Sequence, residues 1–421
     1  MMIFGVNEDE FEIHKQFEVK GVLYHEITLK NRGCRCMGCG RYHTNIKEYR
    51  TKKIRVSKDS VILYHQRRFI CPGCRKSHME NNPFNGKEKK FSASLIKEIL
   101  DYLKRYNHTF LDAAEHFGMT GTEVMRIFDR YCQTERNPLS RIVCFDEIYF
   151  SRKRRKKYVL VLLNFKNRAI LDVLKDRDRS TLVSYLRKIP KAERDRVKYV
   201  CTDMNDIYRE VIRIFLPDAF HVADSFHVVK NVSKMLDDVR KRILRRYSDN
   251  TRSDEYYLLK YKDGLLYARD GMSSRFSEVR YNHHFHYDIS DQQKLDMMLK
   301  LDRDLRLSYE FYHRYIRFND KDYEDISEAQ NELDDIINEL RVSGIRECEV
   351  LSGTLESWCE EIINSFRRCD GIRVSNGPME GRNSYIKKIL KLANGYDSFE
   401  RFRNRIIYSL NKMARHSFGM D

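Results

Sequence analysis

The chain has 421 residues, of which 41% are hydrophobic, enough for two or three domains with cores of their own. Lysine and arginine outnumber aspartate and glutamate by 79 to 62, so the formal net charge is +17. This composition excludes a disordered acidic chain, and no apolar run approaches the roughly 18 residues of a membrane-spanning helix. A folded, basic protein of this kind most often binds a polyanion.

The N-terminal stretch, residues 1–16, carries acids where a secretion signal would have a basic start and an apolar core. We therefore expect a cytoplasmic, nucleoid-associated protein with no membrane partner. In a reducing compartment its 11 cysteines are expected to be thiols or metal ligands rather than disulfides.

Two C-x-x-C turns predict a metal site near the N-terminus. Cys36 and Cys39 form the first turn, and Cys71 and Cys74 form the second. Four thiolates suit one structural Zn²⁺ ion, and the strand-like sequence between the turns favours a zinc ribbon with an enlarged hairpin. Cys34 competes with Cys36 for this role, His43 and His78 are possible substitute ligands, and free thiols or a redox pair are the alternative to zinc.

Helical periodicity begins at residue 92. Apolar residues recur at helical spacing through residues 92–106, and two further apolar stripes in 109–131 are separated by the turn sequence GMT. Two helices joined by a short turn form a helix-turn-helix pattern, although such pairs also occur in ordinary helical cores. The second helix would present Thr122, Glu123 and Arg126 to a DNA groove.

The densest basic run follows a predicted strand. A charge run is usually solvated surface, but several such runs in a chain with this net charge favour contacts with phosphates. The expected DNA contacts in this run are Arg152, Lys153, Arg154, Arg155, Lys156 and Lys157.

After residue 140 the pattern predicts a mixed α/β sheet. Strands are expected at 141–150, 157–165 and 168–176, then a helix at 180–190, a strand at 197–205, a helix at 207–217 and a strand within 218–229. Three strands in a meander followed by alternating helices and strands is the order of ribonuclease-H-like cores.

Two acids lie where predicted central strands end. Asp146 ends the first strand and Asp203 ends the fourth, whereas Glu147 on the opposite face is expected in solvent or paired with the basic loop. Carboxylates that cluster at one sheet edge repel, so at least one is expected to have a raised pKa unless a cation compensates it. Oxygen ligands of this kind suit Mg²⁺ or Mn²⁺.

A third acid is expected from a C-terminal helix within 375–396. Ser375 or Asn376 would precede that helix, and Glu380 would lie in its first turn. Asn383 and Lys387 would follow Glu380 on one polar face, able to contact DNA phosphates.

The segment 232–371 reads as a charge-rich helical insertion. The only tryptophan, Trp358, is in helical register with apolar neighbours, so core packing is a better interpretation than stacking on a DNA base.

Taken in order, these motifs resemble the DDE insertion-sequence transposases of the ISL3 family. The paired C-x-x-C turns are followed by FDE at 145–147, CTDM at 201–204, DSFHVVKN at 224–231 and NGPMEGRNSYIK at 376–387. The resemblance covers nearly the whole chain. It implies a zinc-binding region, a helix-turn-helix, a ribonuclease-H-like core and the catalytic triad Asp146, Asp203 and Glu380. The roles of Asp224 and His227 stay open, since a helix cap and a packed histidine would explain them equally well.

The expected organisation therefore has five parts. They are a zinc-ribbon domain (1–88), a helix-turn-helix domain (89–135), the first part of the catalytic core (136–231), the helical insertion (232–371) and the C-terminal helices of the core (372–421).

The expected function is a transposase that binds terminal inverted repeats and target DNA, and cuts and joins DNA strands with two Mg²⁺ (or Mn²⁺) ions per active site. One Zn²⁺ would be structural, and a homodimer or larger complex would hold two DNA ends. The alternatives are a non-catalytic DNA-binding regulator and a metal-dependent DNA nuclease.

Overall fold

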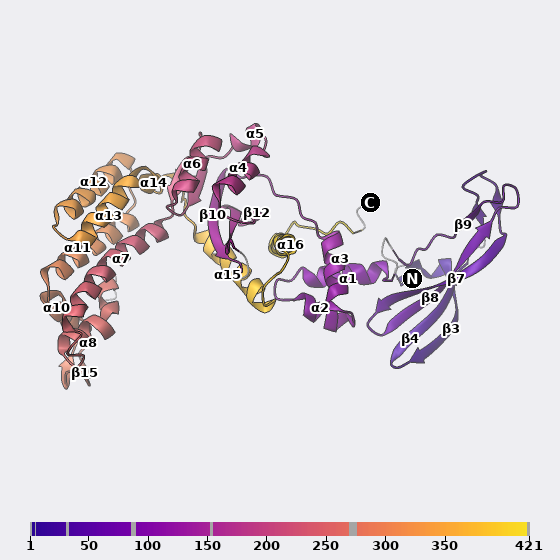
Figure 1. The fold of residues 1–421 in the computed structure, drawn as a ribbon, viewed down its shortest axis with the longest axis horizontal. Coiled ribbons are helices and arrows are strands. Elements are labelled where there is room, and N and C mark those ends of the chain that lie inside the picture. Colours follow the sequence, from indigo (N-terminus) through magenta and orange to yellow (C-terminus); the bar gives the residue numbers. More distant parts are fainter. Residues whose placement is uncertain are drawn as a thin grey trace. The chain divides into compact units, whose positions relative to one another are not determined.

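The computed structural model describes residues 2–4, 6–30, 33–85, 90–151, 155–268 and 276–418. The chain forms two compact units (Figure 1). The first comprises residues 1–136, 150–152 and 383–421, and the second comprises 137–149 and 153–382. Among the described residues, no helix combines the length and apolar character needed to cross a bilayer.

A twisted sheet dominates the N-terminal part of the first unit. Its strand order is β3-β4-β8-β7, and β9 pairs with the end of β8. In β8 the alternating residues Ile62 and Tyr64 are fully buried and pack with Ile27 and Ile54. The bounds are β3 Phe11–Val19, β4 Val22–Leu29, β7 Ile46–Ser57, β8 Ser60–Ile70 and β9 Ser77–Met79, with β1 Met2–Ile3 and β2 Val6–Asn7 as a separate short pair.

The long antiparallel pair β7–β8 is the enlarged hairpin expected between the two C-x-x-C turns. A short ribbon of β5 (Cys34–Arg35) and β6 (Tyr42–His43) flanks the first turn. The second turn lies between β8 and β9.

Three helices follow in the first unit: α1 (Ala93–Leu103), α2 (Phe110–Phe117) and α3 (Gly121–Tyr131). The side chains of Ser92, Thr109 and Thr120 cap their N-termini. Gly118 ends α2 with a φ of 63°, a left-handed conformation that glycine adopts without strain. The two apolar stripes predicted from the sequence are the buried faces of α2 and α3.

The C-terminal helix α16 (Phe399–Leu410) packs on these three helices. Tyr408 donates from its hydroxyl to the carbonyl of Leu100 at 3.0 Å, and the buried Arg405 donates to the carbonyl of Arg105 at 2.9 Å. The domain boundaries expected from the sequence group residues 372–421 with the catalytic core. In the structure, residues 383–421 belong to the first unit instead. The physical reason is this shared core, to which Tyr408 contributes a buried ring.

A five-stranded mixed sheet forms the centre of the second unit. Its order is β12-β11-β10-β13-β14. The first three strands in the chain form the antiparallel meander, and β13 and β14 run parallel to β10. The bounds are β10 Ile142–Tyr149, β11 Tyr158–Asn164, β12 Ile170–Leu174, β13 Tyr199–Thr202 and β14 Phe220–Ala223.

Helices cover this sheet. Leu182 and Leu186 of α4 (Arg179–Arg187) and Ile212 of α6 (Asp206–Phe215) pack with Phe145 and Leu160 of the sheet. The short α5 (Lys191–Arg194) leads into β13. This alternation is the order that the sequence pattern predicted, except that 218–229 is a strand followed directly by a helix.

The segment after β14 is a helical bundle, as predicted for 232–371, and its described part also contains a small hairpin. Figure 1 shows its helices gathered together, and they share one apolar core. Trp358 is buried at its edge, where it lies against Arg209 and His221, so the expected packing role is confirmed. The bounds are α7 Ser225–Leu244, α8 Asp254–Tyr261, β15 Arg280–Asn282, β16 Tyr287–Ile289, α10 Asp291–Lys300, α11 Arg303–Asp320, α12 Ile326–Val342, α13 Arg346–Ser357 and α14 Cys359–Asn364.

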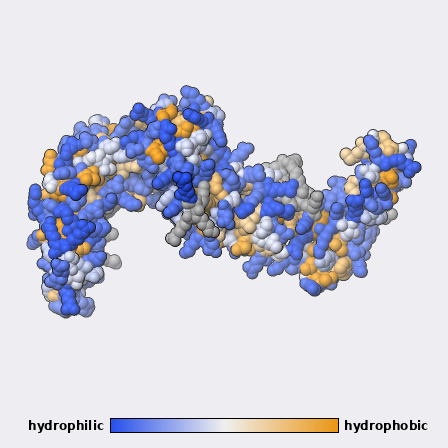
Figure 2. Space-filling view, in the orientation of Figure 1, coloured by the Kyte–Doolittle hydropathy of each residue, from blue (hydrophilic) through white to orange (hydrophobic). Residues whose placement is uncertain are grey.

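After a two-strand turn, β17 (Arg368–Cys369) and β18 (Ile372–Arg373), the chain enters α15 (Gly377–Leu392), which begins in the second unit and ends in the first. Figure 2 shows a face on which hydrophilic side chains predominate, in keeping with the high charge of the chain.

Candidate active site

Three acids form a row across neighbouring strands of the mixed sheet. The parallel pairing of β10 with β13 ends at Cys144 and Cys201, and two residues further along each strand stand Asp146 and Asp203. The pairing of β13 with β14 ends at Thr202 and Ala223, and the next residues are Asp203 and Asp224. Residues at one level of adjacent parallel strands share a face, so these side chains meet at one edge. We call Asp146, Asp203 and Asp224 the acid row.

The position of Asp146 differs in one respect from the prediction. It is not the last residue of its strand, because β10 continues to Tyr149 and pairs there with β11. The pairing of β10 with β11 continues past Asp146, whereas the parallel pairing of β10 with β13 ends at Cys144. At the level of the acid row, β10 is therefore paired with β11 but not with β13.

Asp146 carries the electrostatic signature expected of clustered acids. Burial, and then the negative charge of Asp203, raise the pKa of Asp146 to about 6. Its Oδ1 accepts a hydrogen bond of 2.7 Å from the backbone N–H of Glu147. The expectation that at least one acid has a raised pKa is thereby confirmed, and a nearby cation would relieve this repulsion.

His227 on the first turn of α7 holds the other two acids. Its Nδ1 donates to Asp224 Oδ2 at 3.0 Å and lies 2.8 Å from Asp203 Oδ1. The carboxylates of Asp203 and Asp224 raise the pKa of His227 to about 10, so the ring is a cation at neutral pH. Asp203, Asp224 and His227 offer ligand atoms that all lie within 4.8 Å of one another.

The sequence left the roles of Asp224 and His227 open, and the structure brings both to the acid row. The usable signal was positional: Asp224 directly follows β14 as Asp203 directly follows β13. The parallel pairing of those strands, which the pattern alone does not give, makes the two positions neighbours.

The start of α15 docks beside the acid row. The backbone N–H of Asn376 donates to Asp224 Oδ1 at 3.2 Å, and its side-chain Nδ2 donates to the carbonyl of Phe145 at 3.2 Å. Glu380 lies one turn later, where its N–H donates to the carbonyl of Asn376 at 3.1 Å. Its carboxylate is exposed. A segment distant in sequence therefore brings the start of α15 against the acid row, while the Glu380 carboxylate is not among the ligand atoms that cluster at Asp203, Asp224 and His227.

The predicted polar face of α15 is wrong at one position. Glu380 and Lys387 are exposed, but Asn383 is 5% exposed and lies on the buried stripe with Met379 and Ile386. Residues 379, 383 and 386 follow the i, i+4, i+7 spacing of one helix face, so packing of that face takes Asn383 inward.

Glu147 points away from the acid row, as its opposite pleat requires. Its carboxylate accepts a hydrogen bond of 2.6 Å from Tyr208 and forms an ion pair with Arg177. Among the described residues these are its partners, rather than the basic loop.

The other predicted DNA-binding residues have mixed surroundings. Thr122 and Arg126 are exposed on α3, whereas Glu123 is half-buried and its carboxylate accepts hydrogen bonds from Thr120, completing the helix cap. Glu123 is thus engaged in the cap rather than presented to a groove. The expectation for Glu123 is corrected in this respect, because a carboxylate in a capping box already has its donors.

In the basic loop, Arg152, Lys153 and Arg154 lie outside the described residues. Arg155 and Lys157 are exposed. Lys156 is exposed as well but forms ion pairs with Asp176 and Asp178.

The four cysteines of the C-x-x-C turns converge, and all four sulfurs lie within 4.8 Å of one another. Cys36 Sγ is 3.4 Å from Cys74 Sγ, and Cys39 Sγ is 3.5 Å from Cys71 Sγ. Hydrogen bonds from the backbone N–H groups of Gly38 and then Cys39 lower the pKa of Cys36 to about 6. A closed cluster of four cysteine sulfurs fits Zn²⁺.

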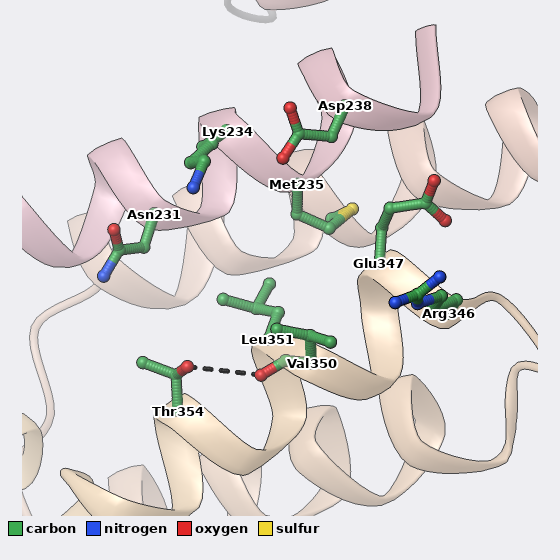
Figure 3. A pocket seen from close by; sticks show the side chains of 9 residues that line it. All are labelled: Asn231, Lys234, Met235, Asp238, Arg346, Glu347, Val350, Leu351 and Thr354. Atoms are coloured by element: carbon green, nitrogen blue, oxygen red, sulfur yellow. Dashed lines mark hydrogen bonds between the residues drawn. The ribbon is translucent and has the colours of Figure 1, made fainter. Parts of the chain in front are cut away.

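A separate pocket of about 360 Å³ lies between α7 and α13. Figure 3 shows Met235 of α7 and Leu351 of α13 lining it, with the charged Lys234 and Asp238 on the side of α7 and Arg346 on the side of α13. No member of the acid row lines this pocket, so it is not part of the candidate active site.

An acid row at one sheet edge and a four-cysteine cluster in a basic chain are features of metal-using proteins that act on nucleic acids. The comparison with known families is consistent with this class. The model of a family described as transposase, the DDE type of the ISL3 group, matches residues 143–406. This span exceeds half of the chain and contains the acid row, His227 and Glu380, so the protein belongs to the ISL3 family of DDE transposases.

A curated relative agrees with this assignment. The transposase for insertion sequence element IS1001 of Bordetella parapertussis is 22% identical over 381 residues, which cover 87% of this chain and 86% of the relative. The similarity therefore extends beyond the matched family region into the N-terminal part of the chain.

Proposed function

We propose that this transposase binds the terminal inverted repeats of its own insertion sequence and cuts and joins DNA strands with divalent metal ions. The observation that carries the proposal is the acid row, in which the pKa of Asp146 is raised by burial and by Asp203. A metal ion gives a physical reason for keeping these acids together.

The proposed catalytic residues are Asp146, Asp203 and Glu380, held by a ribonuclease-H-like sheet and the first turn of α15. Carboxylate oxygens match the ligand preference of Mg²⁺ and Mn²⁺, which keep water and substrate phosphates as their remaining ligands. Two such ions, when bound, would activate the attacking water or 3′-hydroxyl and stabilise the leaving oxygen of the phosphodiester.

The chain's own residues orient these ligands. His227 fixes the Asp203 carboxylate through the contact of 2.8 Å and ties it to the buried Asp224. Asp224 in turn accepts from the backbone of Asn376, which anchors the start of the helix that carries Glu380. Asp224 and His227 are therefore proposed as positioning residues that link the sheet to α15.

DNA recognition is assigned to the first unit. The helix pair α2–α3 forms a helix-turn-helix in this proposal, with Thr122 and Arg126 exposed on the recognition helix. Exposed cations of both units, Arg155 and Lys157 in the second and Lys387 in the first, would contact the phosphate backbone without reading sequence. Two ends of an element require two active sites, so a homodimer or a larger complex is the proposed assembly.

The proposal is tested with the purified full chain, Mg²⁺ and a duplex that carries the terminal repeat of its own element. Nicked and joined strands are resolved on a denaturing gel. We expect the native chain to cut and join this DNA, and Asp203→Asn and Glu380→Gln to bind the repeat without cutting it. The matched control is Asp218→Asn, an exposed acid of the same unit, which should keep full activity. Normal cleavage by either active-site variant would overturn the catalytic assignment.

A further inference from the structure

A second cluster of metal-ligand side chains lies in the zinc-ribbon region. Cys34, His43 and His78 offer ligand atoms that lie within 4.8 Å of one another, as a group distinct from the four cysteines. The Nε2 atoms of His43 and His78 lie 3.9 Å and 2.9 Å from Cys34 Sγ. Ligands around a tetrahedral Zn²⁺ are separated by roughly 3.4 to 3.8 Å, given bonds of about 2.1 to 2.3 Å. The three side chains are thus already near the separation that a single ion requires.

The backbone holds these side chains independently of the four-cysteine cluster. Cys34 and His43 are directly opposed in the ribbon of β5 and β6. His78 comes from β9, where it is opposed to Phe69 of β8. Three strands from separate parts of the sequence therefore converge on one point.

The surroundings of His43 indicate a ligand rather than a packed ring. His43 is 5% exposed, and its Nδ1 has no hydrogen-bond partner within the described part of the chain. Its Nε2 faces the sulfur of Cys34, a weak hydrogen-bond partner. Burial of an imidazole with so little polar compensation is unfavourable. A cation bound at Nε2 would replace the weak contact with sulfur by a metal–nitrogen bond, which would offset part of this cost.

Phe69 closes one side of the cluster. Its buried ring lies 6.0 Å from that of His43 and 5.9 Å from that of His78, measured between centroids. An apolar wall beside two imidazoles fixes their orientation and limits the access of water to a bound metal.

We propose that Cys34, His43 and His78 bind a second Zn²⁺ ion, separate from the ion of the four-cysteine cluster. One sulfur and two nitrogens suit zinc, and solvent would occupy the fourth position. This ion would fasten the β5–β6 ribbon to the edge strand β9. The candidates Cys34, His43 and His78 would then be ligands of their own site rather than substitutes in the first one.

The test measures zinc per chain in the purified full-length protein by elemental mass spectrometry. We expect two zinc ions in the native chain and one in His78→Ala and in Cys34→Ser. The matched control is His65→Ala, a half-buried histidine of β8 outside the cluster, which should retain two. A native chain with one zinc that both cluster variants also retain would overturn the proposal.

A residue-specific readout separates loss of the second ion from misfolding. The zinc-loaded chains are treated with N-ethylmaleimide, and each cysteine is scored by peptide mass spectrometry. In His78→Ala we expect Cys34 to become alkylated while the exposed Cys39 stays protected by its own zinc. Equal alkylation of Cys34 in the native and variant chains would contradict a metal bond to Cys34. In the native protein, both Cys34 and Cys36 should be protected from alkylation. A native protein in which Cys34 is protected but Cys36 is alkylated would contradict two separate sites, because the two cysteines would then compete for one zinc ion.

Discussion

Replacing Asp146 by Asn should stabilise the metal-free second unit, and the gain should depend on pH. Burial and Asp203 raise the pKa of Asp146 from an ordinary value of 3.8 to about 6 in the folded chain. The folded state therefore binds this proton more tightly than the unfolded state does. The resulting penalty is absent below the unfolded pKa, grows as the pH rises towards 6, and is constant above 6.

The magnitude follows from this difference. A rise from 3.8 to about 6 corresponds to about 3 kcal/mol at most, at about 1.4 kcal/mol for each pKa unit. Because Asp146 is only partly buried, screening by solvent reduces this value, and we expect a gain of about 1 to 2 kcal/mol at pH 7.5. At pH 4.5 about one third of it should remain.

The assay is urea unfolding without divalent metal, followed by the fluorescence of Trp358. This side chain is the only tryptophan and is buried in the second unit beside β14, so its emission reports that unit alone. Asp218→Asn, which removes an exposed charge, serves as the control and should change little. Destabilisation by Asp146→Asn at pH 7.5, or an equal gain at both pH values, would refute the electrostatic reasoning.

Three further outcomes are expected. Contacts with Asp203 and Asp224 raise the pKa of His227 to about 10, so the stabilisation that His227 contributes is complete below the unfolded pKa of 6.5 and is lost as the pH rises through 10. The unfolding free energy of the second unit should therefore fall between pH 7 and 10. The same fall in a His227→Gln chain would contradict this. Arg126→Ala should relax sequence preference by about 1 to 3 kcal/mol at one base pair in binding titrations, whereas an equal loss on random DNA would exclude Arg126 as a base-reading residue. Removal of zinc with a chelator should increase hydrogen exchange in residues 30–80, because metal binding is coupled to folding of this region; exchange that stays slow there, or rises equally in the second unit, would contradict a local zinc site.

The sequence was most informative where hydrophobic periodicity is strong. The five strands and alternating helices of the mixed sheet follow apolar runs such as 158–164, which is buried over most of its length. Strand β3 is mostly exposed and buries only Phe11 in the core, so most of its length depends on pairing with β4. Local pattern predicts elements that bury a face, and it misses those that depend on a neighbour.

The candidate site shows the same division. Asp146 and Asp203 were visible because acids interrupt or follow apolar strands. The clustering of Asp203 with Asp224 depends on the register between β13 and β14, and the burial of Asn383 depends on what packs against α15. The separation of Cys34 from the four-cysteine cluster depends in turn on its pairing with His43. Contacts of this kind join distant segments and have no signature in local spacing.

The central claim is that Asp203 is a ligand of the metal used in strand cleavage. The most direct measurement is cleavage of element-end DNA by Asp203→Cys in Mg²⁺ and in Mn²⁺. A thiolate is a poor ligand for the hard Mg²⁺ ion and a better one for Mn²⁺. We predict that Asp203→Cys is inactive in Mg²⁺ and regains cleavage in Mn²⁺, while Asp203→Asn stays inactive in both. Full activity of Asp203→Cys in Mg²⁺, or equal recovery of the Asn variant in Mn²⁺, would contradict a direct bond between Asp203 and the catalytic metal.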